Sequence, residues 1–181
     1  LQQVEQEITG HFSNYRFDLV SHTLYEFIWN EYCDWYLELA KPVLTATNID
    51  PSAARGTRQI LVRVLEAILR LAHPLMPFIT EEIWQSIKSY AAVNGNSIML
   101  QPYPLADEQR IDQNAIENVE WLKKIVIGIR NIRGEMNIAP SKALPIIFNN
   151  GSAADRQRYR DSQLFIESLA KIESANWLEA G

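Results

Sequence analysis

Residues 15–42 read YRFDLVSHTLYEFIWNEYCDWYLELAKP, and apolar residues recur along this segment at the spacing of a helix. The recurring positions are Phe17, Val20, Leu24, Phe27, Ile28, Trp35 and Leu39. Nine of the chain's 18 aromatic residues lie between Phe12 and Tyr36. One buried stripe of a small bundle needs fewer large side chains than this. We therefore expect a central helix that packs on two sides, or that packs on one side and presents the other to a partner.

Length and composition favour one domain, or one domain with a small appendage, among the 181 residues. No apolar run is long enough to cross a membrane, so no membrane association is expected. The single cysteine, Cys33, excludes an internal disulfide and offers no zinc cluster. A reducing compartment suits this composition, and we expect a cytoplasmic protein. The first residues have neither an initiator methionine nor a signal-peptide pattern, which suggests a fragment of a longer protein.

Charge is unevenly distributed along the chain. The net charge of −5 argues against a general nucleic-acid coat. Residues 1–50 hold two basic and eight acidic residues, whereas residues 123–142 hold five basic residues and one acidic residue. Four arginines accompany one glutamate in residues 55–70. An acidic protein with two basic stretches can still bind a phosphate backbone locally.

The remaining segments predict a mainly α fold with a small mixed part. Helices are expected up to residue 12, from 51 to 72, from 77 to about 91, from 112 to 137 and from 152 to 172. Short strands are expected at 97–101, 143–148 and 174–178. Pro42 should kink the aromatic helix and leave about one more turn. We expect two domains: a helical bundle over 1–95, and a long helix with a small α/β subdomain over 96–181.

One arginine of the 112–137 helix needs a partner. Arg133 falls inside the apolar arc formed by Ala115, Val119, Leu122, Val126, Ile129 and Met136. A guanidinium at the border of a core is unfavourable unless its hydrogen bonds and charge are satisfied. The sequence leaves two partners open, an internal carboxylate or a phosphate of a ligand.

The usual catalytic constellations are not found in the sequence. It has no glycine-rich phosphate loop and no HExxH motif, and its three histidines lie far apart. Cys33 has no paired base and is expected to be a small hydrophobe. Asp34 and Glu38 are like charges four residues apart, which is typical of a solvated helix edge. The residues alone therefore predict a helical binding module without a catalytic centre, metal or cofactor.

A family resemblance rests on the same aromatic segment. Phe17-Asp18 and the segment 24–42 resemble the anticodon-binding domain of valyl-tRNA synthetases. The run CDWYLE at 33–38, with Lys41-Pro42 after it, is the most specific part of the resemblance. The run HPLMPFITEEIW at 73–84 is similar to a junction shared with the isoleucyl and leucyl enzymes. Segments 97–104 and 129–135 extend the resemblance over essentially the whole chain.

The resemblance implies a class I aminoacyl-tRNA synthetase anticodon-binding bundle, followed by a small α/β part that lies against the tRNA stem. Such enzymes use ATP to attach valine to its tRNA, but their catalytic, editing and coiled-coil segments do not occur in this sequence. ATP would bind in that catalytic domain, so no cofactor is expected in this chain. The implied partners are valine tRNA and the enzyme's own catalytic domain, and a monomer is expected. The first helix of the bundle is expected to be cut, with part of the anticodon pocket missing.

The resemblance and the chemistry of single-stranded RNA together suggest contact residues. Unstacked bases are bound by stacking on aromatic or guanidinium planes and by hydrogen bonds to base edges. Candidates for these contacts are Trp29, Asn30, Cys33, Leu37 and Lys41. Candidates for phosphate contacts, which position RNA without reading bases, are Lys123, Arg130, Arg133 and Lys142. The alternative is a protein-interaction bundle that binds no nucleic acid, and salt-dependent RNA binding would separate the two.

Overall fold

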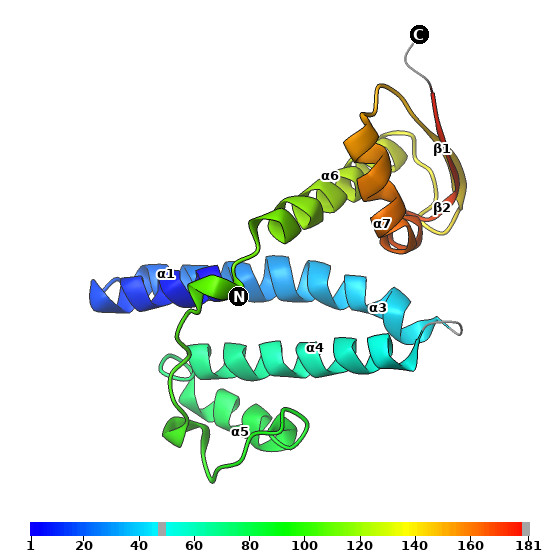
Figure 1. The fold of residues 1–181 in the computed structure, drawn as a ribbon. Coiled ribbons are helices and arrows are strands. Elements are labelled where there is room, and N and C mark those ends of the chain that lie inside the picture. The colour runs from blue at the N-terminus through cyan, green and yellow to red at the C-terminus, as the bar shows by residue number, and fades with distance from the viewer. Residues whose placement is uncertain (47–49, 179–181) are drawn as a thin grey trace. The chain divides into compact units, whose positions relative to one another are not determined.

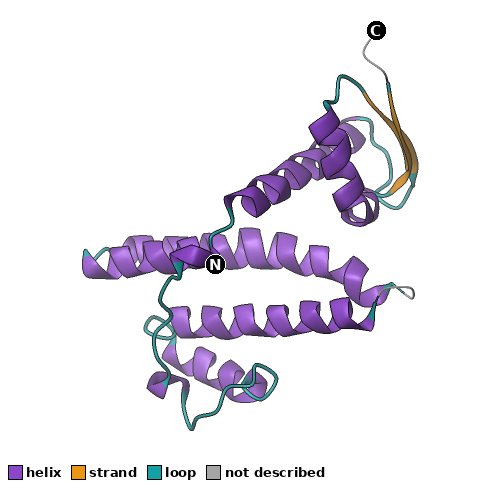
Figure 2. Ribbon diagram, in the orientation of Figure 1, coloured by secondary structure: helices purple, strands orange, loops and turns teal. Residues whose placement is uncertain are grey.

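The computed structural model describes residues 1–46 and 50–178, and it divides into two compact units, Leu1–Ile111 and Asp112–Gly181. The fold is mainly helical with two short strands, as predicted (Figure 2). Residues 96–111, which the sequence analysis assigned to the second domain, belong to the first unit.

The first unit is built almost entirely from helices (Figure 1). Its elements are α1 (Gln2–Ser13), α2 (Phe17–Glu26), η1 (Phe27–Tyr36), α3 (Leu37–Thr45), α4 (Pro51–Ala72), α5 (Pro77–Ile87), η2 (Ile98–Leu100) and η3 (Glu108–Arg110). α2, η1 and α3 follow one another without a break and form the aromatic helix. The helix continues past Pro42 to Thr45, as predicted.

The middle of the aromatic helix is not α-helical. η1 is a π-helix of ten residues, and the sequence analysis expected regular helical spacing there. π-helices bond each residue to the fifth residue along and are rare outside single turns, which often lie at functional sites. Tyr32 is the buried residue of η1, and its hydroxyl donates to the Leu61 carbonyl at 3.1 Å. Burial, with smaller contributions from Tyr36 and Cys33, raises the pKa of Tyr32 to about 12.

Among the described residues, the hydrophobic clusters below and the buried carboxylate of Glu66 help to hold this unit together. The first cluster consists of Ile8, Val20, Leu24, Leu71 and Ala72, and the second of Leu69, Trp84 and Ile98. Between them, Glu66 is only 3% exposed and accepts hydrogen bonds from the Trp84 indole at 3.0 Å and from Arg70 at 2.8 and 3.0 Å. A buried carboxylate is tolerated here because charged and neutral donors both satisfy it.

The predicted helix starts at the two prolines are confirmed, whereas one predicted strand is wrong. α4 begins at Pro51 with the Asp50 side chain accepting from the Ser52 amide at 3.0 Å, and α5 begins at Pro77. Residues 97–101 were expected to form a strand, but η2 is a short 3₁₀ helix. The Ile98 amide donates to the Glu81 carboxylate at 3.0 Å, so it is not available to a sheet.

The second unit joins a long helix to a β-α-β arrangement. Its elements are α6 (Gln113–Glu135), β1 (Leu144–Phe148), α7 (Ala153–Ala170) and β2 (Ile172–Trp177). The strands pair in parallel, with Phe148 opposite Trp177, and α7 is the crossover between them. The second and third predicted strands are thereby confirmed. Two residues of the expected apolar arc, Val119 and Met136, are instead 42% and 68% exposed.

Candidate nucleic-acid interface

The aromatic helix presents exposed side chains at three of its predicted contact positions, Trp29, Asn30 and Lys41. Trp29 is 53% exposed, and its ring lies 6.4 Å from that of Tyr25, measured between centroids. Asn30 is also exposed, and its amide nitrogen donates to the Glu26 carboxylate. The planes of the two rings are tilted by 53°, and each exposed ring face is an apolar surface of the kind on which a base can stack.

The candidates Cys33, Leu37 and Lys41 on this helix differ in accessibility. Cys33 and Leu37 are half-buried, so their side chains offer only part of their surface. Lys41 is exposed, and its ammonium pairs with Glu38 one turn earlier. An exposed pair of this type contributes only about 0–1 kcal/mol, so Lys41 can exchange its partner for a phosphate at little cost.

The basic candidates of the second unit divide into exposed and buried residues. Arg130 is exposed, and its guanidinium donates twice to the Leu169 carbonyl, at 3.0 and 3.3 Å. The Lys142 side chain is exposed as well. Lys123, in contrast, is 8% exposed and its Nζ donates to Glu120 at 2.7 Å. The expectation that Lys123 lies beside the apolar arc as a phosphate contact is not supported by its burial.

Arg133 has a partner that the sequence analysis did not consider. It is 6% exposed, and its guanidinium donates to five main-chain carbonyls, those of Ala139, Pro140, Lys142, Ala170 and Lys171. The shortest of these hydrogen bonds is 2.6 Å, to Lys142. Of the two partners that the sequence left open, an internal carboxylate or a ligand phosphate, the internal carboxylate is not found: main-chain carbonyls take its place. Three of these carbonyls lie between α6 and β1, and the other two belong to the last residue of α7 and the residue after it, where a helix leaves its carbonyls without helical partners.

The sequence did not predict that several aromatic rings near the helix turns would be exposed. Tyr15, in the turn between α1 and α2, is 81% exposed, and Phe78, at the start of α5, is 90% exposed. Phe17 was expected in the apolar stripe but is 52% exposed, and its ring lies 6.4 Å from that of Tyr15. Tyr15 has a left-handed backbone with φ of 55°, which turns the chain and is uncommon for a residue with a side chain. The feature of the sequence that could have indicated this exposed ring was the short connection between α1 and α2.

The α1–α2 turn and the α4–α5 turn lie at the same end of the helical unit (Figure 1). The packing of Phe12 and Leu75 on one cluster agrees with this arrangement. Phe12 is near the end of α1 and Leu75 lies between α4 and α5, and both pack on the cluster that contains Val20 and Leu71. Aromatic side chains this exposed have no role in a core, and grouped exposed apolar residues often mark a binding surface.

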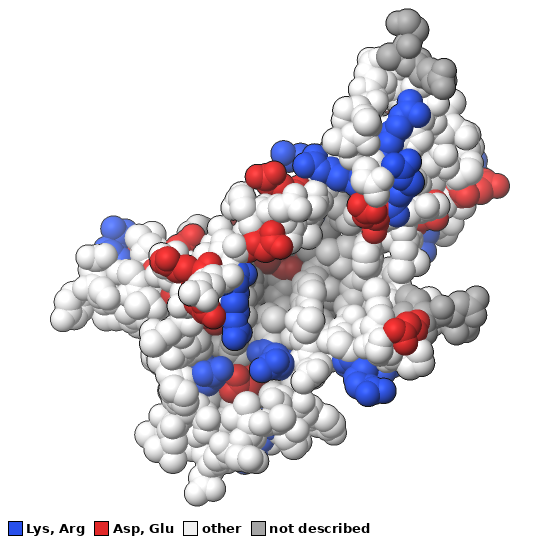
Figure 3. Space-filling model, in the orientation of Figure 1, with Lys and Arg blue, Asp and Glu red and all other residues white. Residues whose placement is uncertain are grey.

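Acidic and basic side chains are interspersed over the visible face of the protein (Figure 3). No group of three or more His, Cys, Asp or Glu side chains with metal-binding geometry occurs among residues 1–46 and 50–178. Within the same ranges, none of the helices combines the length and apolar character needed to cross a bilayer.

Comparison with protein families identifies the chain. The family model described as anticodon-binding domain of tRNA ligase matches residues 1–148. The chain therefore belongs to the family of anticodon-binding domains of tRNA ligases. This membership supports recognition of a tRNA anticodon as the function, and it does not favour the alternative of a protein-interaction bundle without nucleic acid.

Proposed function

We propose that this chain binds the anticodon stem-loop of valine tRNA as part of a valine–tRNA ligase. The observation that carries the choice of valine is the run CDWYLE at 33–38 with Lys41-Pro42, which resembles the valyl enzymes among their relatives. This run forms the end of η1 and the start of α3, next to exposed Trp29 and Asn30. The ligase's catalytic domain would supply ATP binding and the chemistry, and it is the second partner we propose.

Unpaired anticodon bases would stack on the exposed rings. Trp29 with Tyr25 provides one stacking site, Tyr15 with Phe17 provides a second, and the exposed Phe78 ring at the start of α5 provides a third. Stacking of a base on an aromatic ring contributes about 1–3 kcal/mol and tolerates any base. Discrimination between bases therefore needs polar groups at the edge of the rings, for which Asn30 is the nearest candidate on the aromatic helix.

Exposed basic residues would contact the phosphates. We propose Lys41, Arg130 and Lys142 for this role, because all three are exposed. Lys123 and Arg133 are better explained as structural residues, since each is buried and hydrogen-bonded within the second unit. Each phosphate contact should add salt dependence to binding without adding base preference.

Competition between anticodon stem-loops tests this proposal. A fluorescent valine stem-loop bound to the chain is displaced with unlabelled stem-loops of valine tRNA and of a tRNA for another amino acid. We expect the valine loop to compete at least tenfold better. Equal competition would contradict the choice of valine while leaving anticodon binding intact.

Ring substitutions test the stacking surfaces. Trp29→Ala and Phe78→Ala should each weaken stem-loop binding by about 5- to 100-fold if its ring stacks on a base. Tyr90→Ala is the matched control, because Tyr90 is 75% exposed and lies outside these stacking sites. If both substitutions have the same effect as Tyr90→Ala, the bases do not stack on these rings.

A further inference from the structure

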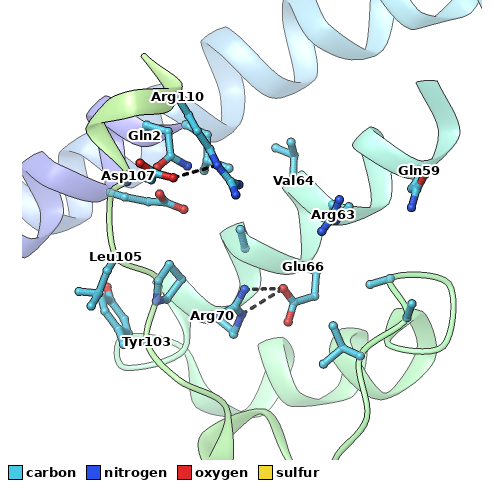
Figure 4. A pocket seen from close by; sticks show the side chains of 17 residues that line it. Gln2, Gln59, Arg63, Val64, Glu66, Arg70, Tyr103, Leu105, Asp107 and Arg110 are labelled. Atoms are coloured by element: carbon cyan, nitrogen blue, oxygen red, sulfur yellow. Dashed lines mark hydrogen bonds and ion pairs between the residues drawn. The ribbon is translucent and has the colours of Figure 1, made fainter. Parts of the chain in front are cut away.

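A polar cavity of about 590 Å³ opens in the first unit, between α1, α4 and the connection from residue 91 to 110. Its volume is within the range of small-molecule sites, which is about 300–1,000 Å³. Figure 4 shows Arg110 and Arg63 extending into the open space from η3 and α4, with Arg70 and Glu66 below them. Neither the sequence analysis nor the family match assigns this cavity a role.

Most charges of the cavity are paired with one another. The charged side chains that line it are Glu5, Arg63, Glu66, Arg70, Asp107 and Arg110. Arg70 pairs with Glu66 at 2.8 Å, and Arg110 pairs with Asp107 at 3.0 Å. The other two charged side chains of the cavity, Glu5 and Arg63, form no such ion pair within the described part of the chain. The exposed Arg63 guanidinium has no ion pair or hydrogen bond to any residue that the structure describes.

Glu5 is the more informative of these two residues. It is 4% exposed, and its Oε2 is the buried side-chain oxygen that has no hydrogen-bond partner among the described residues. The Leu1 amino group, Arg70 and Arg110 act on it electrostatically, and Gln2 hydrogen-bonds to its side chain. A buried acceptor without a hydrogen bond is unfavourable, so a ligand that donates to Oε2 would recover the lost free energy.

We propose that the cavity binds one unpaired nucleotide, with donor groups of the base at the Glu5 carboxylate and the phosphate at Arg63. One buried acid, Glu5, and one exposed base, Arg63, match a ligand with a donor edge and an anionic group. The apolar part of the lining, which includes Val64, Val93 and Pro104, suits the faces of a base. The inference rests on the proposed function only in taking the nucleotide to be part of RNA.

The two acceptor oxygens of the Glu5 carboxylate predict which base the cavity prefers. Guanine presents a ring N–H and an amino group side by side on its Watson–Crick edge, and two adjacent donors match a carboxylate. Adenine and cytosine place an acceptor next to their amino group, and uracil places acceptors on both sides of its N–H. An acceptor held against Glu5 is repelled, so guanine should be preferred and uracil should bind least well.

Titration with mononucleotides tests the cavity directly. Nuclear magnetic resonance shifts of the chain are followed during addition of GMP, AMP, CMP or UMP at one salt concentration. We expect GMP to bind at least tenfold more tightly than UMP, with shifts centred on residues that line the cavity. Equal affinities for GMP and UMP, or no saturable binding of any nucleotide, would overturn the proposal.

Three variants locate the two ligand contacts. Glu5→Gln replaces one acceptor oxygen by a donor and should reduce the preference for GMP over UMP to about twofold or less. Arg63→Gln should weaken all four nucleotides by about tenfold, because it removes the phosphate partner. Arg58→Gln, on the same helix but outside the cavity, is the control and should change nothing. Arg63 and Arg58 are exposed, so these two variants should fold even if Glu5→Gln did not.

The same titrations separate this inference from the proposed function. If the valine stem-loop binds and GMP neither binds nor competes with it, the cavity proposal fails and anticodon recognition stands. If GMP binds with the expected preference while the stem-loop does not bind, the cavity proposal stands and the proposed function fails.

Discussion

Buried charged residues in this protein are satisfied in different ways. Arg133 is surrounded by main-chain carbonyls, and Glu66 accepts from an indole and a guanidinium. Both side chains are almost fully buried, and each is hydrogen-bonded to several partners. Glu5 is buried to the same extent but has an oxygen without a partner. This difference separates residues that stabilise the fold from a residue suited to a ligand.

Arg133→Ala should destabilise the second unit strongly. Five carbonyls lose their common donor, and the site closes imperfectly over the missing side chain. We expect a loss of about 3 kcal/mol in the free energy of unfolding, measured by urea denaturation with tryptophan fluorescence. The matched control is Arg130→Ala on the same helix, where the exposed guanidinium donates to a single carbonyl, so the loss should stay below about 1 kcal/mol. Equal losses for the two variants would contradict the structural role of Arg133.

Glu5→Gln should raise thermal stability at neutral pH. Burial raises the pKa of the Glu5 carboxyl above its ordinary value of 4.5. A raised pKa means that the folded state binds the carboxyl proton more tightly than the unfolded state does. The free energy of unfolding therefore falls as the pH rises from the pKa of Glu5 in the unfolded state through its pKa in the folded state. Glutamine has no carboxyl proton to release, so the Glu5→Gln variant does not lose stability in this way as the pH rises. The melting temperature of Glu5→Gln should therefore exceed that of the parent at pH 7, and the difference should disappear below about pH 4. A difference that does not depend on pH would contradict the account.

At the scale of secondary-structure elements, α7 depends on a capping box at its start. The Ser152 hydroxyl accepts from the Asp155 amide at 3.1 Å, and the Asp155 carboxylate accepts from the Ser152 amide at 2.9 Å. The hydrogen bond from the Ser152 hydroxyl is the main reason that the pKa of Asp155 is lowered from 3.8. The same carboxylate also accepts from the Trp121 indole on α6 at 2.9 Å.

Ser152→Ala should cost about 1 kcal/mol in the stability of the second unit, because it removes the cap. A lowered folded pKa contributes stability above the unfolded value of 3.8, and this contribution is lost as pH falls through the folded pKa. The effect of Ser152→Ala should therefore shrink in acid, below about pH 4. Urea denaturation at pH 7 and pH 3 measures it. An effect that is as large at pH 3 as at pH 7 would show that the Asp155 charge is not involved.

Helix starts could be predicted from sequence because their signals are local. Asp50-Pro51 and Pro77 set the backbone at the starts of α4 and α5 whatever surrounds them. The π-helix could not be predicted, because its hydrogen-bond pattern depends on how the large rings of η1 pack against other helices. The same holds for residues 97–101, where a distant carboxylate, Glu81, takes the amide that a strand would have used.

Some of the candidate contact residues could likewise be predicted from the sequence, and others could not. Exposure of Trp29, Asn30 and Lys41 follows from helical periodicity and is found in the structure. Periodicity places Arg133 in the apolar arc but does not identify the carbonyls that surround it, and it does not predict the burial of Lys123, because a charge pattern cannot tell which polar groups the fold brings near. The exposed rings of Tyr15 and Phe78 were missed because apolar residues near a turn are counted toward the core unless the turn geometry is known.

At the scale of the whole molecule, the family domain and the compact units do not coincide. The match to the anticodon-binding family covers residues 1–148, which is all of the first unit together with α6 and β1 of the second. α7 and β2 lie beyond the match, yet β2 is the strand that pairs with β1. Truncation at residue 148 should therefore leave β1 without its partner and unfold the second unit. Hydrogen exchange of amides in β1 would rise strongly, whereas unchanged protection would contradict this expectation.

The most direct test of the account is a titration of the chain with a fluorescent valine anticodon stem-loop at several salt concentrations. A second stem-loop with a changed middle anticodon base serves as the control. We predict binding that weakens with salt, with a slope reduced by about 0.7 to 1 in Lys142→Gln, and at least tenfold weaker binding of the altered loop. Binding that is independent of salt and equal for both loops would contradict recognition of the anticodon by this domain.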